Sequence, residues 1–220
     1  MREIHNDKLK QDLINQFNYL DLFGFDVQQH VKLFFISQKD HIIQGTQKPE
    51  YLFYLVKGKT KLYEYMENGQ VSLIDFFEPS SFIGEMELID EHAAPLNIQA
   101  IEDCWCLAVP LNELKDTLLT DPVLLKNLLS YIAHKNMKNI RTSTRNQSYP
   151  LSKRLASFIL VTEQNGKYEE KHTQVAQYLG VSYRHLLFVI ADFVQKGYLA
   201  KENNSYNILN MDELKKLANI

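Results

Sequence analysis

The chain of 220 residues contains only two cysteines, Cys104 and Cys106. Two thiols cannot build a disulfide framework, and they suit a protein that is kept in a reducing compartment. An iron–sulfur cluster needs four ligands, mostly cysteines, so one chain cannot hold such a cluster unaided. The scarcity of cysteine therefore argues against a disulfide-stapled secreted domain and against cluster-based redox sensing.

Long hydrophobic runs are missing as well. No uncharged apolar stretch reaches the roughly 18 residues that a membrane span requires. The first residues, MREIHNDKLKQDLINQF, have no apolar segment of signal-peptide length. We therefore expect a cytoplasmic protein without a membrane partner. The composition, 45% hydrophobic and 23% charged, is that of an ordinary globular chain.

The signatures of common catalytic sites are also absent. Cupin-like barrel enzymes bind a metal through two histidines one residue apart, a glutamate and a further histidine. The seven histidines here are scattered, at positions 5, 30, 41, 92, 134, 172 and 185. No phosphate-binding glycine loop, nucleophile elbow or pair of catalytic carboxylates is recognisable. We expect neither a metal site nor catalysis, and a cupin-like barrel enzyme is the alternative.

Charge is divided unevenly along the chain. Residues 1–121 carry 10 Lys+Arg against 20 Asp+Glu, a formal charge of −10. Residues 122–220 carry 14 against 7, a charge of +7, and the two parts together give the −3 of the whole chain. A basic second half indicates contact with a polyanion such as nucleic acid. It argues against a second alternative, a regulatory module that binds a protein instead of DNA.

The first half is dominated by the pattern of short strands. A helix is expected over residues 1–20, and then segments rich in β-branched and aromatic residues alternate with turns. Because no helices are expected between these segments, residues 33–110 are predicted to form an antiparallel barrel or sandwich. With its flanking helices, this domain is predicted to span residues 1–121. The expected strands are 33–38, 41–45, 51–58, 59–69, 70–77 and 98–110.

A long helix is predicted over residues 122–147, after a short one over 111–119. Asp121 can cap the long helix, and Pro122 suits its first turn. Five cations and no acid lie on it, and its apolar stripe thins toward Ile140. Such a helix can cover the barrel and then pair with a copy of itself, although packing on its own domain alone is the other possibility. Residues 147–150 are the expected hinge, because the residue before a proline resists helix.

The most informative stretch runs from His172 to Val194. It indicates two short helices joined by a tight turn: Ala176 is small where the helices approach, Gly180 accepts a positive φ, and Ser182 can cap the second helix. This order is typical of a helix-turn-helix, with an ordinary helical hairpin as the alternative. A helix over 151–162 precedes it and a hairpin of strands 199–202 and 206–209 follows, so residues 148–220 are predicted to be a winged helix-turn-helix domain.

Together these parts resemble the Crp/Fnr family of bacterial transcription regulators. The resemblance covers nearly the whole chain and is carried by residues 52–58, by Phe82-Ile83-Gly84-Glu85 and by the helix pair. Longer strings at residues 71–77, 102–108 and 180–187 are similar to the YeiL-type branch. The resemblance implies an α+β fold: an N-terminal antiparallel β-roll (jelly roll) of the cyclic-nucleotide-binding type, a long dimerisation helix and a C-terminal winged helix-turn-helix.

The resemblance also implies a function. The family binds palindromic promoter DNA as homodimers and is controlled by a signal sensed in the β-roll. For this chain we expect a transcription regulator of that kind, an activator with RNA polymerase as a further partner.

The recognition helix has one evident base-reading side chain. Arg184 has the guanidinium that pairs with O6 and N7 of guanine. Better known members of the family tend to have an Arg-Glu pair after the serine and another Arg one turn later. In this chain the pair is replaced by Tyr183-Arg184 and the later Arg by Phe188. The usual DNA site of the family therefore does not carry over to this chain.

The other DNA candidates have less specific roles. Tyr183 and His185 can reach a phosphate or a base edge, and either Leu187 or Phe188 can touch a thymine methyl group or pack in the core. Thr173, at the start of the first helix, is placed to donate to a phosphate. The remaining candidates are Ser182 and Lys201, with Lys153, Arg154 and Lys196 as further phosphate contacts.

The expected effector region departs from the family pattern. In members that bind cyclic nucleotides, a Gly-Glu pair meets the ribose and an Arg-Ser pair some ten residues later binds the cyclic phosphate. Gly84-Glu85 is present, but Ala93-Ala94-Pro95-Leu96 offers neither a cation nor a hydroxyl. Burying a phosphate there without compensation costs on the order of several kcal/mol. The sequence argues against cAMP and leaves the effector open, with Gly84, Glu85, Ala94 and Pro95 as pocket candidates.

The two cysteines are two residues apart on an expected strand. Both therefore point to one face of that strand, and Trp105 points to the other. Burial is the expected state of both thiols, and a reversible thiol reaction remains the alternative.

Overall fold

The computed structural model describes residues 1–67, 69–90 and 92–218. The chain divides into two compact units, one comprising Met1–Glu64 and Ile74–Asn136 and the other Tyr65–Leu73 and Met137–Ile220. Within the described ranges, no helix is both long and apolar enough to cross a membrane.

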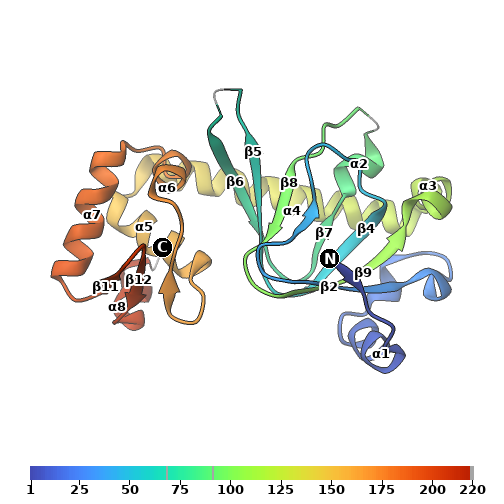
Figure 1. Ribbon diagram of the computed structural model, residues 1–220. Coiled ribbons are helices and arrows are strands. Elements are labelled where there is room, and N and C mark those ends of the chain that lie inside the picture. Colours follow the sequence, from blue (N-terminus) through green and yellow to red (C-terminus); the bar gives the residue numbers. More distant parts are fainter. Residues whose placement is uncertain (68, 91, 219–220) are drawn as a thin grey trace. The chain divides into compact units, whose positions relative to one another are not determined.

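Two antiparallel sheets form the β-roll of the first unit (Figure 1). The strands are β1 (Arg2–Glu3), β2 (Lys32–Ile36), β3 (His41–Ile43), β4 (Tyr51–Lys57), β5 (Thr60–Tyr65), β6 (Val71–Phe77), β7 (Ser81–Ile83), β8 (Asn97–Ala100) and β9 (Cys104–Pro110). One sheet has the order β1-β2-β9-β4-β7 and the other β3-β8-β5-β6. The last strand of the unit, β9, thus lies between β2 and β4, which closes the roll.

Strand β9 shows how the sequence places its side chains on two faces. Cys104 and Cys106 lie in the hydrophobic cluster that also contains residues of the second sheet, such as Ile98. Trp105 and Leu107 belong to the cluster on the opposite face, which the helices cover. The predicted alternation of the cysteines and the tryptophan is confirmed, and it follows from the period of two in a strand.

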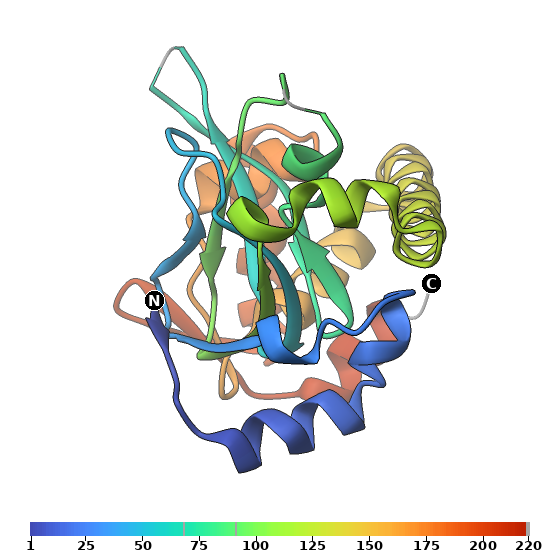
Figure 2. The ribbon, with the colours of Figure 1, turned by 90° about the vertical axis from the view of Figure 1, so that its right-hand side faces the viewer.

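Helices cover the outer face of the five-stranded sheet. They are α1 (Asp7–Gln16), the 3₁₀ turns η1 (Tyr19–Leu22) and η2 (Gln28–His30), α3 (Leu111–Thr120) and the first part of α4 (Pro122–Ser148). Figure 2 looks along α4, with α3 crossing beside it and α1 below. Buried side chains of these elements, such as Ile14, Leu118 and Leu124, share one cluster with Leu107.

Asp121 connects α3 and α4. One of its carboxylate oxygens accepts the N–H of Val123 at 3.0 Å and the other accepts the N–H of Gly24 at 2.8 Å. The predicted capping role is confirmed. The same side chain therefore also fixes the loop around Gly24, which no sequence signal indicated.

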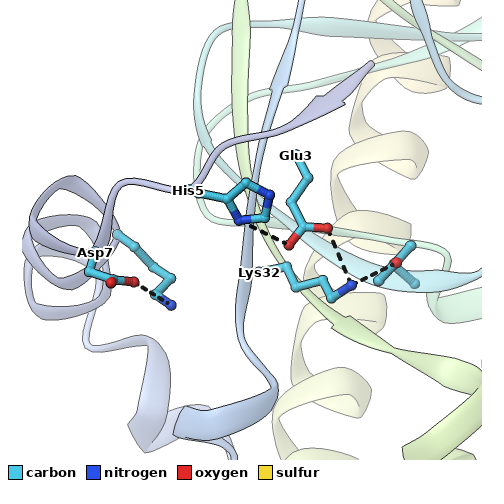
Figure 3. A network of polar contacts seen from close by, with 6 residues as sticks. Glu3, His5, Asp7 and Lys32 are labelled. Atoms are coloured by element: carbon cyan, nitrogen blue, oxygen red, sulfur yellow. Dashed lines mark hydrogen bonds and ion pairs between the residues drawn. The ribbon is translucent and has the colours of Figure 1, made fainter.

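The expected helix over residues 1–20 is shorter than predicted. Residues Arg2–Glu3 form an edge strand with β2, and only residues 7–16 are α-helical. The Nζ of Lys32 lies 3.2 Å from a carboxylate oxygen of Glu3 and 3.3 Å from the hydroxyl of Tyr51 (Figure 3). Strand pairing and this polar contact outweigh the helical periodicity, and Asn6 then caps α1 by accepting the N–H of Leu9 at 2.9 Å.

Two other expectations for the roll need correction. The segment 98–110 is two strands in different sheets, β8 and β9, because the chain turns between the sheets at residues 101–103. Strand β7 and helix α2 (Glu85–Ile89), which follow one another, were not expected. Gly84 separates them with a φ of +93°, a conformation that allows the abrupt change of direction.

The second unit contains the winged helix-turn-helix. Its helices are the end of α4, α5 (Leu151–Thr162), α6 (His172–Tyr178), α7 (Tyr183–Gln195) and α8 (Met211–Ala218). Its sheet has the order β10-β12-β11, with β10 (Lys167–Tyr168), β11 (Leu199–Glu202) and β12 (Ser205–Ile208). The hairpin turns at Asn203 with a φ of +52°. β10 and α8 were not expected, and the hinge is narrower than predicted because α4 continues through Ser148.

Candidate nucleic-acid interface

The turn between α6 and α7 is set by Gly180. Its φ is +64°, and a Cβ built on it would meet no atom within 4 Å. Glycine is therefore required by the backbone conformation and not by lack of space. The N–H of Gly180 donates to the carbonyl of Gln177 at 3.0 Å, and that of Val181 donates to Ala176 at 2.9 Å. These bonds end α6 and turn the chain toward α7.

Ser182 begins the second helix as predicted. Its hydroxyl accepts the N–H of His185 at 3.2 Å. The inner faces of the two helices then pack together through side chains of the predicted spacing. Of these, Val175, Leu179, Leu186 and Val189 are buried and Val181 is half-buried.

The opposite face of α7 is open to solvent. Tyr183 is 49% exposed, Leu187 36% and Phe188 72%, and Arg184 and His185 are exposed too. The exposure of Phe188 excludes packing in the core of its own domain. Arg184 forms no ion pair within the described part of the chain.

Thr173 and Lys201 lie beside an aromatic cluster at the start of α6. The ring of His172 stacks on Tyr168 at 6.1 Å between centroids and lies 5.6 Å from Tyr206 of the wing. Burial lowers the pKa of His172, and the charge of Lys201 lowers it further. The hydroxyl-bearing Thr173 and the cation of Lys201, both exposed, therefore flank the same cluster.

Two of the further phosphate candidates, Arg154 and Lys196, form polar contacts within the domain. The guanidinium of Arg154 donates to the carbonyl of Tyr149 at 2.9 Å and to that of Leu179, which ends α6. Burial lowers the pKa of Arg154. Lys196 forms an ion pair with Asp192 at 2.7 Å. The contact of Arg154 with the end of α6 was not predicted from the sequence.

Comparisons with known proteins agree with this architecture. A family model described as cyclic nucleotide-binding domain matches residues 34–121. The chain is 48% identical over 200 residues to the regulatory protein YeiL of Escherichia coli O157:H7, and the match spans 91% of each chain. A solved structure from Eubacterium rectale, assigned to the crp/fnr family of transcriptional regulators, covers 96% of this chain and 98% of its own with a TM-score of 0.71 and 16% identity. The chain belongs to the Crp/Fnr family of transcription regulators.

More distant Crp/Fnr relatives share the fold. A Crp/Fnr regulator from Thermus thermophilus has a TM-score of 0.62 at 20% identity and covers 86% of this chain and 98% of its own. The CRP-like cAMP-activated global transcriptional regulator of Mycobacterium tuberculosis is 20% identical over 195 residues, 82% of this chain and 85% of the relative.

The Gly-Glu pair of this Crp/Fnr chain has an internal partner. Glu85 is buried, and the Nζ of Lys135 on α4 lies 3.1 Å from one of its carboxylate oxygens. The same ammonium lies 4.3 Å from the ring centroid of Phe77. One turn earlier on α4, the hydroxyl of Tyr131 donates to the carbonyl of Phe82 at 3.0 Å. The role of Lys135 was not predicted, because nothing local to α4 marks it.

The other two effector candidates are less buried than Glu85. Ala94 is exposed and Pro95 is half-buried. A cavity of about 320 Å³ opens between residues of β3, β4 and their connecting loop, including His41, Lys48 and Tyr51. None of Gly84, Glu85, Ala94 and Pro95 lines it. Its place was not predicted, because residues 41–53 carried only a strand pattern.

Both cysteine thiols are buried, as expected. Burial is the main cause that raises the pKa of Cys104 to about 12, and it raises the pKa of Cys106 well above its usual value. The thiol of Cys104 donates to the carbonyls of Lys59 and Glu102 at 3.3 and 3.1 Å. Among the described residues, no three His, Cys, Asp or Glu side chains come together as a potential metal site.

Proposed function

We propose that this chain is a sequence-specific DNA-binding regulator whose helix α7 enters the major groove of promoter DNA. The observation that supports the proposal is the outer face of α7, where Tyr183, Arg184 and Phe188 are exposed while the inner face is held by a buried core and the Ser182 cap. The first turns of a recognition helix present such side chains to base edges. Thr173, His185 and Lys201 are the proposed phosphate contacts.

The proposed active form is a homodimer that pairs through α4. Leu129, on the part of α4 in the first unit, is 69% exposed, and Ile140, on the part in the second unit, is 51% exposed. Met137, also 51% exposed, lies three residues before Ile140. A second copy of α4 would cover these side chains. The dimer would place two α7 helices in half-sites about 34–36 Å apart on a palindrome.

The signal that controls the regulator is proposed to be other than cAMP. Glu85, the carboxylate of the Gly-Glu pair, is already neutralised by Lys135, and the segment Ala93–Leu96 supplies no cation for a cyclic phosphate. A thiol signal finds no support either, since both thiols are buried with raised pKa values. Because the proposed target is chromosomal DNA, the cytoplasm is the proposed place of action.

The proposed output is activation of transcription through contact with RNA polymerase. This part is carried over from the Crp/Fnr family and depends on where the DNA site lies relative to the promoter. Transcription in vitro from the promoter of a bound site, with purified polymerase and with or without the chain, tests it. A decrease in transcript would make the protein a repressor at that promoter.

DNA binding itself is tested by selecting bound sequences from a random duplex pool and titrating the best one at several salt concentrations. We expect log affinity to fall linearly with log salt, because phosphate contacts release counterions. Arg184→Ala should cost about 1–3 kcal/mol and relax the preference at one base pair per half-site. Lys216→Ala, a change on α8 away from the motif, is the control. Absence of any enriched sequence, or equal binding by both variants, would contradict the proposal.

A further inference from the structure

The exposed face of α7 combines several apolar side chains with the cation of Arg184 and the polar side chains of His185 and Gln195. Along this face the side chains of Tyr183, Leu187, Phe188 and Ala191 are exposed beside Arg184. The inner face of the helix is buried. A contiguous apolar patch with a polar rim marks an interaction site. A helix that served only to contact phosphates would carry cations here instead.

We propose that Phe188 reads thymine by contacting its C5-methyl group in the major groove, an inference that rests on the proposed function of the chain. Thymine is the base that presents a methyl group there, and phenylalanine is suited to an apolar contact with it. Phe188 is 72% exposed, the largest exposed fraction among the large apolar side chains of α7, so its ring is available without rearrangement of the core.

The position of Phe188 also fits a base pair close to the one that Arg184 contacts. Four residues bring Phe188 to the same face of α7 as Arg184, about 6 Å further along the axis. The rise per base pair is about 3.4 Å. The guanine read by Arg184 and the thymine read by Phe188 are therefore expected within about two base pairs of each other in each half-site.

DNA is a better occupant of this face than a protein. The face carries Arg184, and residues 122–220 have a net charge of +7, of which +5 lies on residues 122–147 and +2 on residues 148–220. A polyanion is attracted by a positive net charge more strongly than a protein surface of mixed charge is. The apolar groups then add base discrimination to an electrostatic contact that by itself has no sequence preference.

The test uses the full chain and the selected DNA site. Each thymine of a half-site is replaced in turn by deoxyuridine, which lacks only the methyl group. We expect at least one replacement to weaken binding by the wild type about fourfold, the equivalent of about 0.8 kcal/mol for one buried CH₂-sized group. Phe188→Ala should bind the thymine and uracil sites equally, at about the level of the wild type on uracil DNA. Phe188→Leu should keep part of the discrimination.

Leu209→Ala is the matched control, because Leu209 is an exposed apolar residue, at 62%, outside the helix pair. It should discriminate thymine from uracil like the wild type. If no replacement affects the wild type, or if Phe188→Ala still discriminates, the inference is wrong while specific DNA binding stands. If the selection enriches no DNA, the proposed function fails and this inference fails with it. Specific capture of a protein on this face that Phe188→Ala abolishes, with DNA binding unchanged, would also overturn it.

Discussion

The ammonium of Lys135 lies 3.1 Å from the carboxylate of Glu85 and joins α4 to the start of α2 within the first unit. The side chain of Glu85 is 4% exposed and that of Lys135 is 20% exposed. The carboxylate of the Gly-Glu pair is therefore bound by the chain's own cation. A ligand that required Glu85 would have to displace Lys135, and this displacement would change how α4 is held.

Removing the cation should destabilise the first unit. In Lys135→Met the carboxylate of Glu85 stays buried without its partner, and we expect a loss of about 2–4 kcal/mol in the free energy of unfolding. Lys138→Met, three residues further on α4 and exposed, should change it by less than about 0.5 kcal/mol. Urea unfolding of both variants without ligand gives the comparison.

The double variant Glu85→Gln with Lys135→Met separates the charge from the packing. It should recover part of the loss, because no unpaired charge then remains buried. Equal stability of Lys135→Met and Lys138→Met would show that the ion pair contributes nothing.

The turn of the helix pair gives a second prediction. Gly180→Ala should destabilise the second unit by about 1–2 kcal/mol, because a residue with a Cβ resists the φ of +64° even though space is available. Gly180→Asn should cost less, since asparagine tolerates the left-handed conformation. Thermal unfolding followed by circular dichroism measures the order. Equal stability of the alanine variant and the wild type would mean that the turn adapts.

Features that depend on residues close together in the sequence were predicted correctly. The cap of Ser182, the positive φ of Gly180 and the alternation of Cys104, Trp105 and Cys106 depend on neighbours in sequence, and each was found as predicted. The partners that depend on distant contacts were not predictable. Lys135 is 50 residues away from Glu85 in sequence. Arg154 looked like a surface cation until the fold brought it to the end of α6.

The ends of helices and strands were also predicted poorly where distant contacts set them. Residues 1–20 have helical spacing, yet pairing of Arg2–Glu3 with β2 removes the first turn of the expected helix. The segment 98–110 has one continuous strand composition, but it serves two sheets. In both cases a tertiary contact outweighs the local preference.

The buried thiols give a third prediction, on reactivity. Burial raises the pKa of Cys104 to about 12 and that of Cys106 well above its usual value, so both thiols stay protonated at pH 8. Neither should be alkylated by iodoacetamide in the folded protein within hours, and both should react within minutes in urea. Mass spectrometry of the labelled chain measures this. Rapid labelling of the folded protein would contradict this prediction and support control by a thiol-based signal.

His172 provides the fourth prediction, on pH. Burial, and then the charge of Lys201, lowers its pKa below the usual 6.5. As the pH drops below about 6.5, the imidazole of His172 becomes protonated in the unfolded chain before it does in the folded chain. This residue therefore lowers the free energy of unfolding as the pH drops below about 6.5, and it has no such effect at higher pH.

His172→Phe keeps a ring beside Tyr168 and Tyr206 but cannot titrate. We expect the free energy of unfolding, measured in urea at pH 7.5 and 5.5, to fall less in His172→Phe than in the wild type. His41, whose pKa is also lowered by burial, is present in both proteins, so its contribution cancels in the comparison. Parallel pH profiles for the two proteins would show that the aromatic cluster accommodates the charged imidazole.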